Sequence, residues 1–219
     1  MALVRIILFG VPFIVLSFLK IILTLIPLLL FSDQLKAEQV RLLILGDSLS
    51  AAYGMKQEQG WVTLLQDAFE PKGIRVINAA ISGETTDGGL ARLPRLLEQH
   101  QPSHVLIELG GNDGLRGYPV SKLKTNISAM ITMAKDRDIK VILQQMQIPT
   151  NFGRRYNQMF TNAFTTLAEQ HDVPLVPFFL KDIALDDKMM QKDRIHPSVE
   201  AQPVIARFMQ EQLEPLLVR

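Results

Sequence analysis

Short apolar runs alternate with longer segments of helical periodicity, and this alternation constrains the fold more than any other feature of the chain. The apolar runs predict strands at 40–45, 76–80, 104–109, 141–146 and 173–176. Apolar side chains that recur every three or four residues predict helices at 60–69, 87–100, 120–137, 156–171 and 201–217. Strands that alternate with helices form a parallel sheet with right-handed crossovers. We therefore expect one α/β domain with helices on both faces of its sheet.

The start of the chain has a different composition, because residues 6–31 are almost wholly apolar. A cleaved secretory signal explains this pattern: Lys20 supplies the positive charge, 21–31 the apolar region and Ala37 the small residue before the cut. The alternative is an uncleaved anchor, since about 20 apolar residues span a bilayer. Under either interpretation the folded part leaves the cytoplasm, and the periplasm is the expected compartment.

These boundaries assign residues 1–37 to the signal or anchor and residues 38–219 to the folded domain. Removing 1–37 lowers Lys+Arg from 23 to 20 and Asp+Glu from 22 to 21, so the mature net charge is −1. Proteins that bind nucleic acid usually carry a basic field, so we expect no nucleic-acid partner. The chain has no cysteine, which excludes disulfides, thiolate catalysis and cysteine metal sites.

Small and polar residues follow three of the predicted strands. Gly-Asp-Ser follows the first at 46–48, Ala-Ile-Ser-Gly-Glu-Thr the second at 80–85, and Gly-Gly-Asn-Asp-Gly the third at 110–114. In open parallel sheets, ligands bind outside the carboxyl ends of the strands. The fold is therefore expected to bring these three segments to one edge.

Ser48 has three interpretations at this edge. It is a helix cap or turn residue, a phosphate ligand, or a nucleophile. The phosphate interpretation is weak, because the glycine-rich phosphate-binding patterns are absent and Asp47 would repel an anion. A nucleophilic serine would need a base within hydrogen-bond reach and a third group that orients this base.

Four histidines are candidates for that base. His100, His104 and His171 lie at the ends of predicted helices or strands, where structural or solvated roles are expected. His196 differs, because Asp193 precedes it by three residues and can reach the imidazole within one tight turn. A surface turn with an incidental acid is the alternative for a lone D-x-x-H pattern.

Three groups could donate hydrogen bonds to an oxyanion at the same edge. They are the backbone N–H of Ser48, the backbone of Gly83, which permits close approach, and the side-chain amide of Asn112. Taken singly, Gly83 could be a plain turn residue and Asn112 a left-handed loop residue.

Four sequence blocks, "GDSLS", "ISGET", "ELGGNDGLRG" and "DRIHPS", occur in the order found in the SGNH hydrolases, also called the GDSL esterase/lipase family. The chain resembles this family from about 41 to 217. The segments "GLARLP", "NFGRRYN" and "IHPSVEAQP" resemble its branch of exported thioesterases, lysophospholipases and arylesterases.

The resemblance implies a role for each block. Ser48 matches the nucleophile, Asp193 and His196 the acid and base, and Ser48, Gly83 and Asn112 the oxyanion hole. It also implies a flavodoxin-like three-layer α/β/α sandwich with a five-stranded parallel sheet in the order 2-1-3-4-5.

The implied substrates are small acyl esters, thioesters or lysophospholipids, cleaved by a monomer without cofactor or metal. The residues expected to border the acyl chain are Leu115, Arg116, Ile148 and Phe152. Arg154 and Arg155 could meet a phosphate, although such a pair is more often a solvated helix start. Two alternatives remain open, a carbohydrate O-acetylesterase and a non-enzymatic exported domain that binds lipid or sugar.

Overall fold

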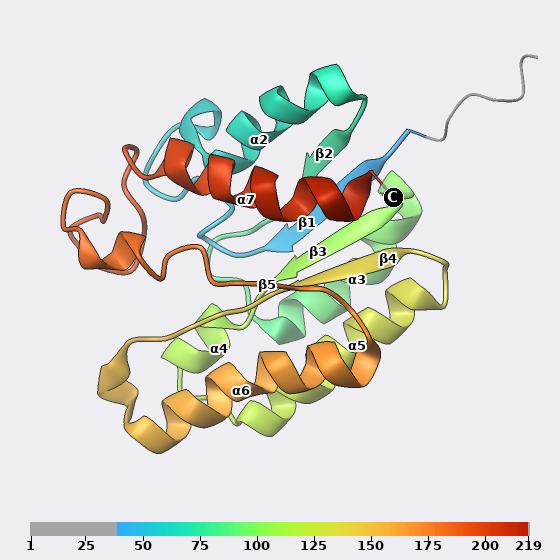
Figure 1. Ribbon diagram of the computed structural model, residues 1–219. Coiled ribbons are helices and arrows are strands. Elements are labelled where there is room, and N and C mark those ends of the chain that lie inside the picture. Colours follow the sequence, from blue (N-terminus) through green and yellow to red (C-terminus); the bar gives the residue numbers. More distant parts are fainter. Residues whose placement is uncertain (1–38, 219) are drawn as a thin grey trace, which may run out of the picture. The chain divides into compact units, whose positions relative to one another are not determined.

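Five parallel strands form one sheet in the computed structural model, which describes residues 39–218 (Figure 1). The strands are β1 (Arg41–Gly46), β2 (Arg75–Asn78), β3 (His104–Glu108), β4 (Lys140–Gln144) and β5 (Leu175–Val176). Their order in the sheet is β2-β1-β3-β4-β5, and every neighbouring pair is parallel. This order confirms the predicted sheet.

The predicted signal or anchor at 1–37 lies outside the described residues. Within residues 39–218, no helix combines the length and the apolarity that crossing a membrane requires.

The two central strands, β1 and β3, are the most deeply buried part of the sheet. Leu42 to Leu45 have no solvent exposure, and neither have Val105, Leu106 and Ile107. The register pairs Ile44 with Leu106 and places Gly46 opposite Glu108 at the carboxyl end. Burial on both faces explains why these strands are continuous apolar runs instead of alternating ones.

Helices cover both faces of the sheet (Figure 1). One face carries α2 and α7, which pack against each other, and the opposite face carries α3, α5 and α6. Their bounds are α2 (Trp61–Phe69), α3 (Thr86–His100), α5 (Val120–Lys135), α6 (Arg154–His171) and α7 (Gln202–Leu217). Each helix turns a buried apolar face to the sheet, as Phe160 and Phe164 of α6 do. The three-layer α/β/α architecture is therefore confirmed.

Short 3-10 helices lie in four of the connections, at Gln57–Gln59, Glu70–Lys72, Thr150–Phe152 and Ile183–Leu185. The last strand, β5, spans two residues instead of the predicted four. Val173 N–H donates to the Ala168 carbonyl oxygen at 3.0 Å and so closes α6, while Pro174 has no N–H to give to the sheet.

The helix α4 (Gly111–Leu115) was not expected, because glycine disfavours helices and the segment reads as a polar loop. Tertiary packing explains its glycine at 114. A Cβ at Gly114 would lie 2.6 Å from Ile148 Cγ2 and 2.8 Å from Phe160 Cε2. The close approach of this short helix to α6 thus requires glycine, whatever the local helix propensity.

Candidate active site

Ser48 lies two residues beyond the end of β1, at the carboxyl edge of the sheet. The chain turns at once, because the backbone N–H groups of Ser50 and Ala51 donate to the Asp47 carbonyl oxygen at 3.2 and 3.0 Å. A rigid central strand therefore positions the serine, and the turn that follows places it at the edge where parallel sheets bind ligands.

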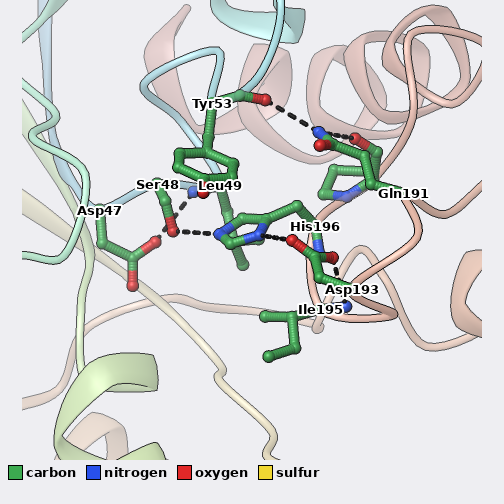
Figure 2. A network of polar contacts seen from close by, with 9 residues as sticks. Asp47, Ser48, Leu49, Tyr53, Gln191, Asp193, Ile195 and His196 are labelled. Atoms are coloured by element: carbon green, nitrogen blue, oxygen red, sulfur yellow. Dashed lines mark hydrogen bonds and ion pairs between the residues drawn. The ribbon is translucent and has the colours of Figure 1, made fainter.

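His196 connects Ser48 with Asp193 through its two ring nitrogens (Figure 2). Its Nε2 atom lies 2.8 Å from Ser48 Oγ, and its Nδ1 atom lies 2.7 Å from Asp193 Oδ2. With its proton on Nδ1, the imidazole donates to the carboxylate and leaves Nε2 free to accept from the Ser48 hydroxyl. The structure thus brings together the three side chains singled out in the sequence.

Backbone groups of the same turn also hold the Asp193 carboxylate. Its Oδ1 atom accepts hydrogen bonds from the backbone N–H groups of Ile195 and His196, both at 3.0 Å. Partial burial by itself raises the pKa of Asp193, but these bonds and the imidazole contact outweigh it and hold the pKa below its ordinary value. The carboxylate therefore stays charged at neutral pH and is available to stabilise an imidazolium.

A tight turn over residues 190–197 carries the aspartate and the histidine. Met190 and Pro197 form an antiparallel bridge at its base, and Gln191 N–H donates to the His196 carbonyl oxygen at 2.8 Å. Arg194 adopts a left-handed conformation with φ of 57° at the tip. This geometry folds the D-x-x-H pattern back on itself, so that Asp193 meets the imidazole.

Two residues that contact or belong to this turn, Tyr53 and Gln191, were missed by the sequence reasoning. The Tyr53 ring stacks on the His196 ring, with centroids 4.1 Å apart and planes inclined by 29° (Figure 2). The Gln191 side-chain amide donates to the carbonyl oxygens of Tyr53 and Pro197, at 2.8 and 3.1 Å. No local pattern marks either residue, since each role depends on a segment distant in sequence.

The short helix α4 positions Asn112 beside the serine turn. The Asn112 Nδ2 atom donates to Asp47 Oδ2 at 3.1 Å and to the Glu84 carbonyl oxygen at 3.0 Å. Gly83, the residue before Glu84, has a left-handed φ of 80°, which favours glycine. The three segments after β1, β2 and β3 therefore meet at one place, with Asn112 as their link.

Two buried carboxyl groups, those of Asp47 and Glu108, lie at the start of the turn that carries Ser48. Glu108 Oε2 accepts from Ser50 Oγ at 2.6 Å and from Asp47 N–H at 3.2 Å. Burial raises the pKa of Asp47 to about 7, although it accepts hydrogen bonds from Leu49 N–H and from the Asn112 amide. Burial, and then the Asp47 charge, raise the pKa of Glu108 well above its ordinary value.

Glycine at position 46 makes room for this arrangement. A Cβ there would lie 2.5 Å from Glu108 Oε2 and 3.0 Å from Ser50 Oγ. The glycine of the "GDSLS" block is therefore needed for the close approach of the Glu108 carboxyl group to the strand end.

A pocket of about 800 Å³ opens beside Ser48 and His196. Its walls come from the segments after β1, β3, β4 and β5, and its apolar side chains include Leu49, Leu115, Met146, Ile148, Phe178 and Leu180. Of the residues expected to border an acyl chain, Leu115 and Ile148 line this pocket. The volume and the apolar walls suit a hydrocarbon chain.

The other two residues expected to border an acyl chain are Arg116 and Phe152. Arg116 donates from Nη2 to the Gly83 carbonyl oxygen at 3.1 Å, and Phe152 packs on the Tyr156 ring with centroids 6.4 Å apart. Neither belongs to the pocket wall. Arg154 and Arg155 are the exposed first residues of α6.

The remaining histidines make contacts away from Ser48. His104 is buried at the start of β3, and burial, with a contribution from Lys140, lowers its pKa to about 4. The His171 Nε2 atom lies 2.7 Å from Ser128 Oγ, and His100 ends α3. Among residues 39–218, no three carboxylate or imidazole side chains are grouped so as to hold a metal ion.

Comparison with known proteins identifies the family. The model of the GDSL-like lipase/acylhydrolase family matches residues 44–202, which include Ser48, Gly83, Asn112, Asp193 and His196. The chain belongs to this family. It is therefore an acyl hydrolase, an enzyme that cleaves carboxylic esters.

Individual relatives of this hydrolase agree with the family assignment. It is 48% identical over 193 residues to an arylesterase of Vibrio mimicus, covering 86% of this chain and 96% of the relative. It is 48% identical over 176 residues to thioesterase 1/protease 1/lysophospholipase L1 of Escherichia coli K12, covering 80% and 84%. The crystal structure of the psychrotrophic esterase EstA from a Pseudoalteromonas species matches it with a TM-score of 0.79 and 48% identity, covering 82% of this chain and 99% of that chain.

Proposed function

We propose that Ser48 is the nucleophile of this ester hydrolase, His196 its general base and acid, and Asp193 the group that orients His196. The observation that carries the assignment is the chain of hydrogen bonds from Ser48 through His196 to Asp193, at 2.8 and 2.7 Å. A serine hydroxyl is a weak nucleophile and reacts when a base within about 2.6–3.2 Å takes its proton.

The proposed reaction has two halves. His196 Nε2 takes the hydroxyl proton while Ser48 Oγ bonds to the substrate carbonyl carbon. The tetrahedral oxyanion then collapses, and the bond from the carbonyl carbon to the leaving oxygen or sulfur breaks while His196 gives this atom its proton. The alcohol or thiol departs, and the acyl group stays on Ser48. Water attacks this acyl-serine by the same route and releases the carboxylic acid. The side chains supply every proton transfer, so the proposal assigns no cofactor and no metal.

The proposed oxyanion hole combines the backbone N–H groups of Ser48 and Gly83 with the Asn112 amide. Both N–H groups of that amide already donate, one to the Asp47 carboxyl and one to the Glu84 carbonyl. A developing oxyanion must therefore share or replace one of these bonds. A charged oxyanion is a better acceptor than the neutral Glu84 carbonyl, because hydrogen bonds to charged groups are about twice as strong as neutral ones. The exchange thus favours the transition state over the resting enzyme.

For the substrate, we propose carboxylic esters and thioesters with a medium-length acyl chain. Supporting observations are the apolar pocket of about 800 Å³ beside Ser48 and the relatives named arylesterase and thioesterase 1/protease 1/lysophospholipase L1. A carbohydrate O-acetylesterase would need a smaller acyl site. Family membership removes the non-enzymatic alternative, since the chain is an ester hydrolase.

We further propose that residues 1–37 direct the enzyme out of the cytoplasm, as a cleaved signal or as a membrane anchor, and that residues 38–219 act as a periplasmic monomer. The apolar run at 6–31 supports this proposal. N-terminal sequencing of the enzyme recovered from the periplasm tests it, and a cytoplasmic enzyme with an intact N-terminus would contradict it.

The function is tested with a panel of p-nitrophenyl esters and acyl thioesters from acetyl to octanoyl. We expect the octanoyl substrates to have the higher kcat/KM, whereas an acetyl-only enzyme would support the O-acetylesterase alternative. Ser48→Ala should abolish hydrolysis and covalent labelling by a fluorophosphonate while the protein stays folded. Activity near that of the wild type in this variant would remove Ser48 as the nucleophile.

A further inference from the structure

The nucleophile and the base lie on two segments that are far apart in the chain. Residues 47–54, called the Ser48 loop below, follow β1 and carry Ser48. Residues 190–197, called the histidine turn, follow β5 and carry Asp193 and His196. The hydrogen bond between Ser48 and His196 forms across this junction. Other contacts must therefore keep the two segments at a fixed separation, because the hydrogen bond between Ser48 and His196 breaks and reforms in every catalytic cycle.

We propose that Gln191 is a positioning residue, whose side-chain amide joins the Ser48 loop to the histidine turn and so sets the separation of the two reacting groups. This inference rests on the proposed roles of Ser48 and His196. Gln191 Nε2 has two N–H groups, and both are used: one donates to the Tyr53 carbonyl oxygen at 2.8 Å and the other to the Pro197 carbonyl oxygen at 3.1 Å.

The backbone of Gln191 strengthens the connection. Its N–H donates to the His196 carbonyl oxygen at 2.8 Å, and its carbonyl oxygen accepts from Arg194 N–H at 2.9 Å. Gln191 is thus fixed within the histidine turn, and only its amide reaches across to the Ser48 loop (Figure 2). A displacement of this turn would stretch the Tyr53 bond at the same time as the Ser48–His196 contact.

The connection continues through the Tyr53 ring. The hydrogen bonds at Nδ1 and Nε2 hold the imidazole at its two nitrogens, but the ring can still pivot about the line that joins them. The stacked Tyr53 ring, with centroids 4.1 Å apart, blocks this pivot on one face. Because Gln191 donates a hydrogen bond to the Tyr53 backbone, it also helps to fix the Tyr53 ring that stacks on His196.

Gly54 provides the space that the Gln191 amide occupies. A Cβ at this position would lie 2.6 Å from Gln191 Oε1, and the φ of 75° is one that side chains rarely adopt. The residue after Tyr53 is therefore shaped to admit the amide. This fit is independent of the hydrogen bonds and points to the same contact.

The test compares two substitutions that each remove a hydrogen bond from a glutamine amide to the backbone of residues 47–54. Gln191→Met keeps the length of the side chain but donates no hydrogen bond. Gln57→Met is the matched control, since Gln57 Nε2 donates to the Ala51 carbonyl oxygen at 3.1 Å and does not reach the histidine turn. A misplacement near 1 Å at reacting groups can cost about 100-fold in rate, so we expect Gln191→Met to lower kcat by about 10- to 100-fold.

Three readouts separate positioning from a loss of folding. In Gln191→Met, KM for an octanoyl ester should stay within about twofold of the wild type, since the pocket is intact. The rate constant for labelling by a fluorophosphonate should fall by the same factor as kcat, and the thermal midpoint should change by only a few degrees. Wild-type kcat in Gln191→Met, or an equal loss in Gln57→Met, would overturn the proposal.

Tyr53 supplies a second and independent test. Tyr53→Phe keeps a ring against the imidazole and should retain most of kcat, whereas Tyr53→Leu should lower it with KM unchanged. Equal activities of the two variants would contradict the role of the stacked ring. Ser48→Ala, assayed alongside, separates the two hypotheses: an active Ser48→Ala overturns the proposed function, whereas an inactive Ser48→Ala with a fully active Gln191→Met overturns only this inference.

Discussion

The side-chain amide of Asn112 donates a hydrogen bond to the carboxyl group of Asp47, the residue directly before Ser48, at 3.1 Å. The proposed oxyanion donor is therefore attached to the turn that presents the proposed nucleophile. Asp47 is almost completely buried, so water does not compete for this bond. A shift of the turn would carry donor and nucleophile together, which preserves their relative geometry during the reaction.

We expect Asn112→Ala to lower kcat for an octanoyl ester by about 100-fold or more, because one oxyanion donor contributes about 3 kcal/mol to transition-state stabilisation. KM should change little, since the ground-state carbonyl gains less from this donor. Steady-state kinetics on the purified variant provide the measurement. Asn157→Ala removes an exposed amide that donates to the Thr150 and Gly153 carbonyl oxygens and serves as the control. A kcat within threefold of the wild type would argue against the assignment of Asn112.

Asp193→Asn should lower kcat by at least about 100-fold without unfolding the turn. The Asn oxygen can keep the bonds from the Ile195 and His196 backbone N–H groups, but its NH₂ group would face His196 Nδ1. The imidazole proton would then move to Nε2, where it prevents acceptance of the Ser48 proton. Kinetics and circular dichroism together check this prediction.

The control for that substitution is Asp187→Asn. Asp187 is highly exposed and pairs at 3.5 Å with Arg194, a residue of the turn that carries His196. Its substitution by Asn therefore removes one negative charge, as Asp193→Asn does, but away from the imidazole. We expect its kcat to match the wild type. A comparable loss in both variants would assign the effect to the charge of the turn instead of to the tautomer.

Glu108→Gln should change the pH dependence of stability. Burial, followed by the Asp47 charge, raises the pKa of Glu108 well above its ordinary value of 4.5. The unfolded chain therefore releases this proton at lower pH than the folded protein. The stability that this group contributes is fully present below pH 4.5. It is lost as the pH rises toward the pKa that Glu108 has in the folded protein. Glutamine has no proton to release, so the variant should gain stability relative to the wild type as the pH increases.

Urea unfolding at about pH 5 and about pH 8 measures this effect. The difference in free energy of unfolding between Glu108→Gln and the wild type should shift in favour of the variant at the higher pH. Glu98→Gln makes the same substitution on the exposed side of α3 and is the matched control. A Glu108→Gln difference that is constant with pH would contradict the raised pKa.

Gly114→Ala tests the packing of α4. The added Cβ would lie 2.6 Å from Ile148 Cγ2 and 2.8 Å from Phe160 Cε2, so we expect a loss of about 1–3 kcal/mol in the free energy of unfolding. Urea unfolding measures the loss. Because Ile148 lines the pocket, kcat/KM for octanoyl esters should fall more than for acetyl esters. In an Ile148→Ala background the stability penalty should shrink, and an unchanged penalty would place the strain elsewhere.

Much of this protein could be predicted from local sequence. The alternation of apolar runs and helical periodicity predicted the parallel sheet and its two helical layers, because each element must bury an apolar face or stripe. The segments after β1, β2 and β3 were expected at one edge, since parallel strands end on the same side. Ser48, Asp193 and His196 were recognisable because their chemistry needs particular residue types, two of them within one turn.

Other features depended on the tertiary structure alone. The helix α4 forms in a glycine-rich segment because Gly114 packs closely on Ile148 and Phe160. Arg116 bonds to the Gly83 carbonyl oxygen outside the pocket, and Gln191 reaches Tyr53 across 138 positions of sequence. The sequence by itself determined the alternation of the main strands and helices and which side chains can do chemistry, since both depend on local periodicity and residue type. The fold decided which distant atoms meet within hydrogen-bonding distance, because that depends on backbone positions that no local pattern encodes.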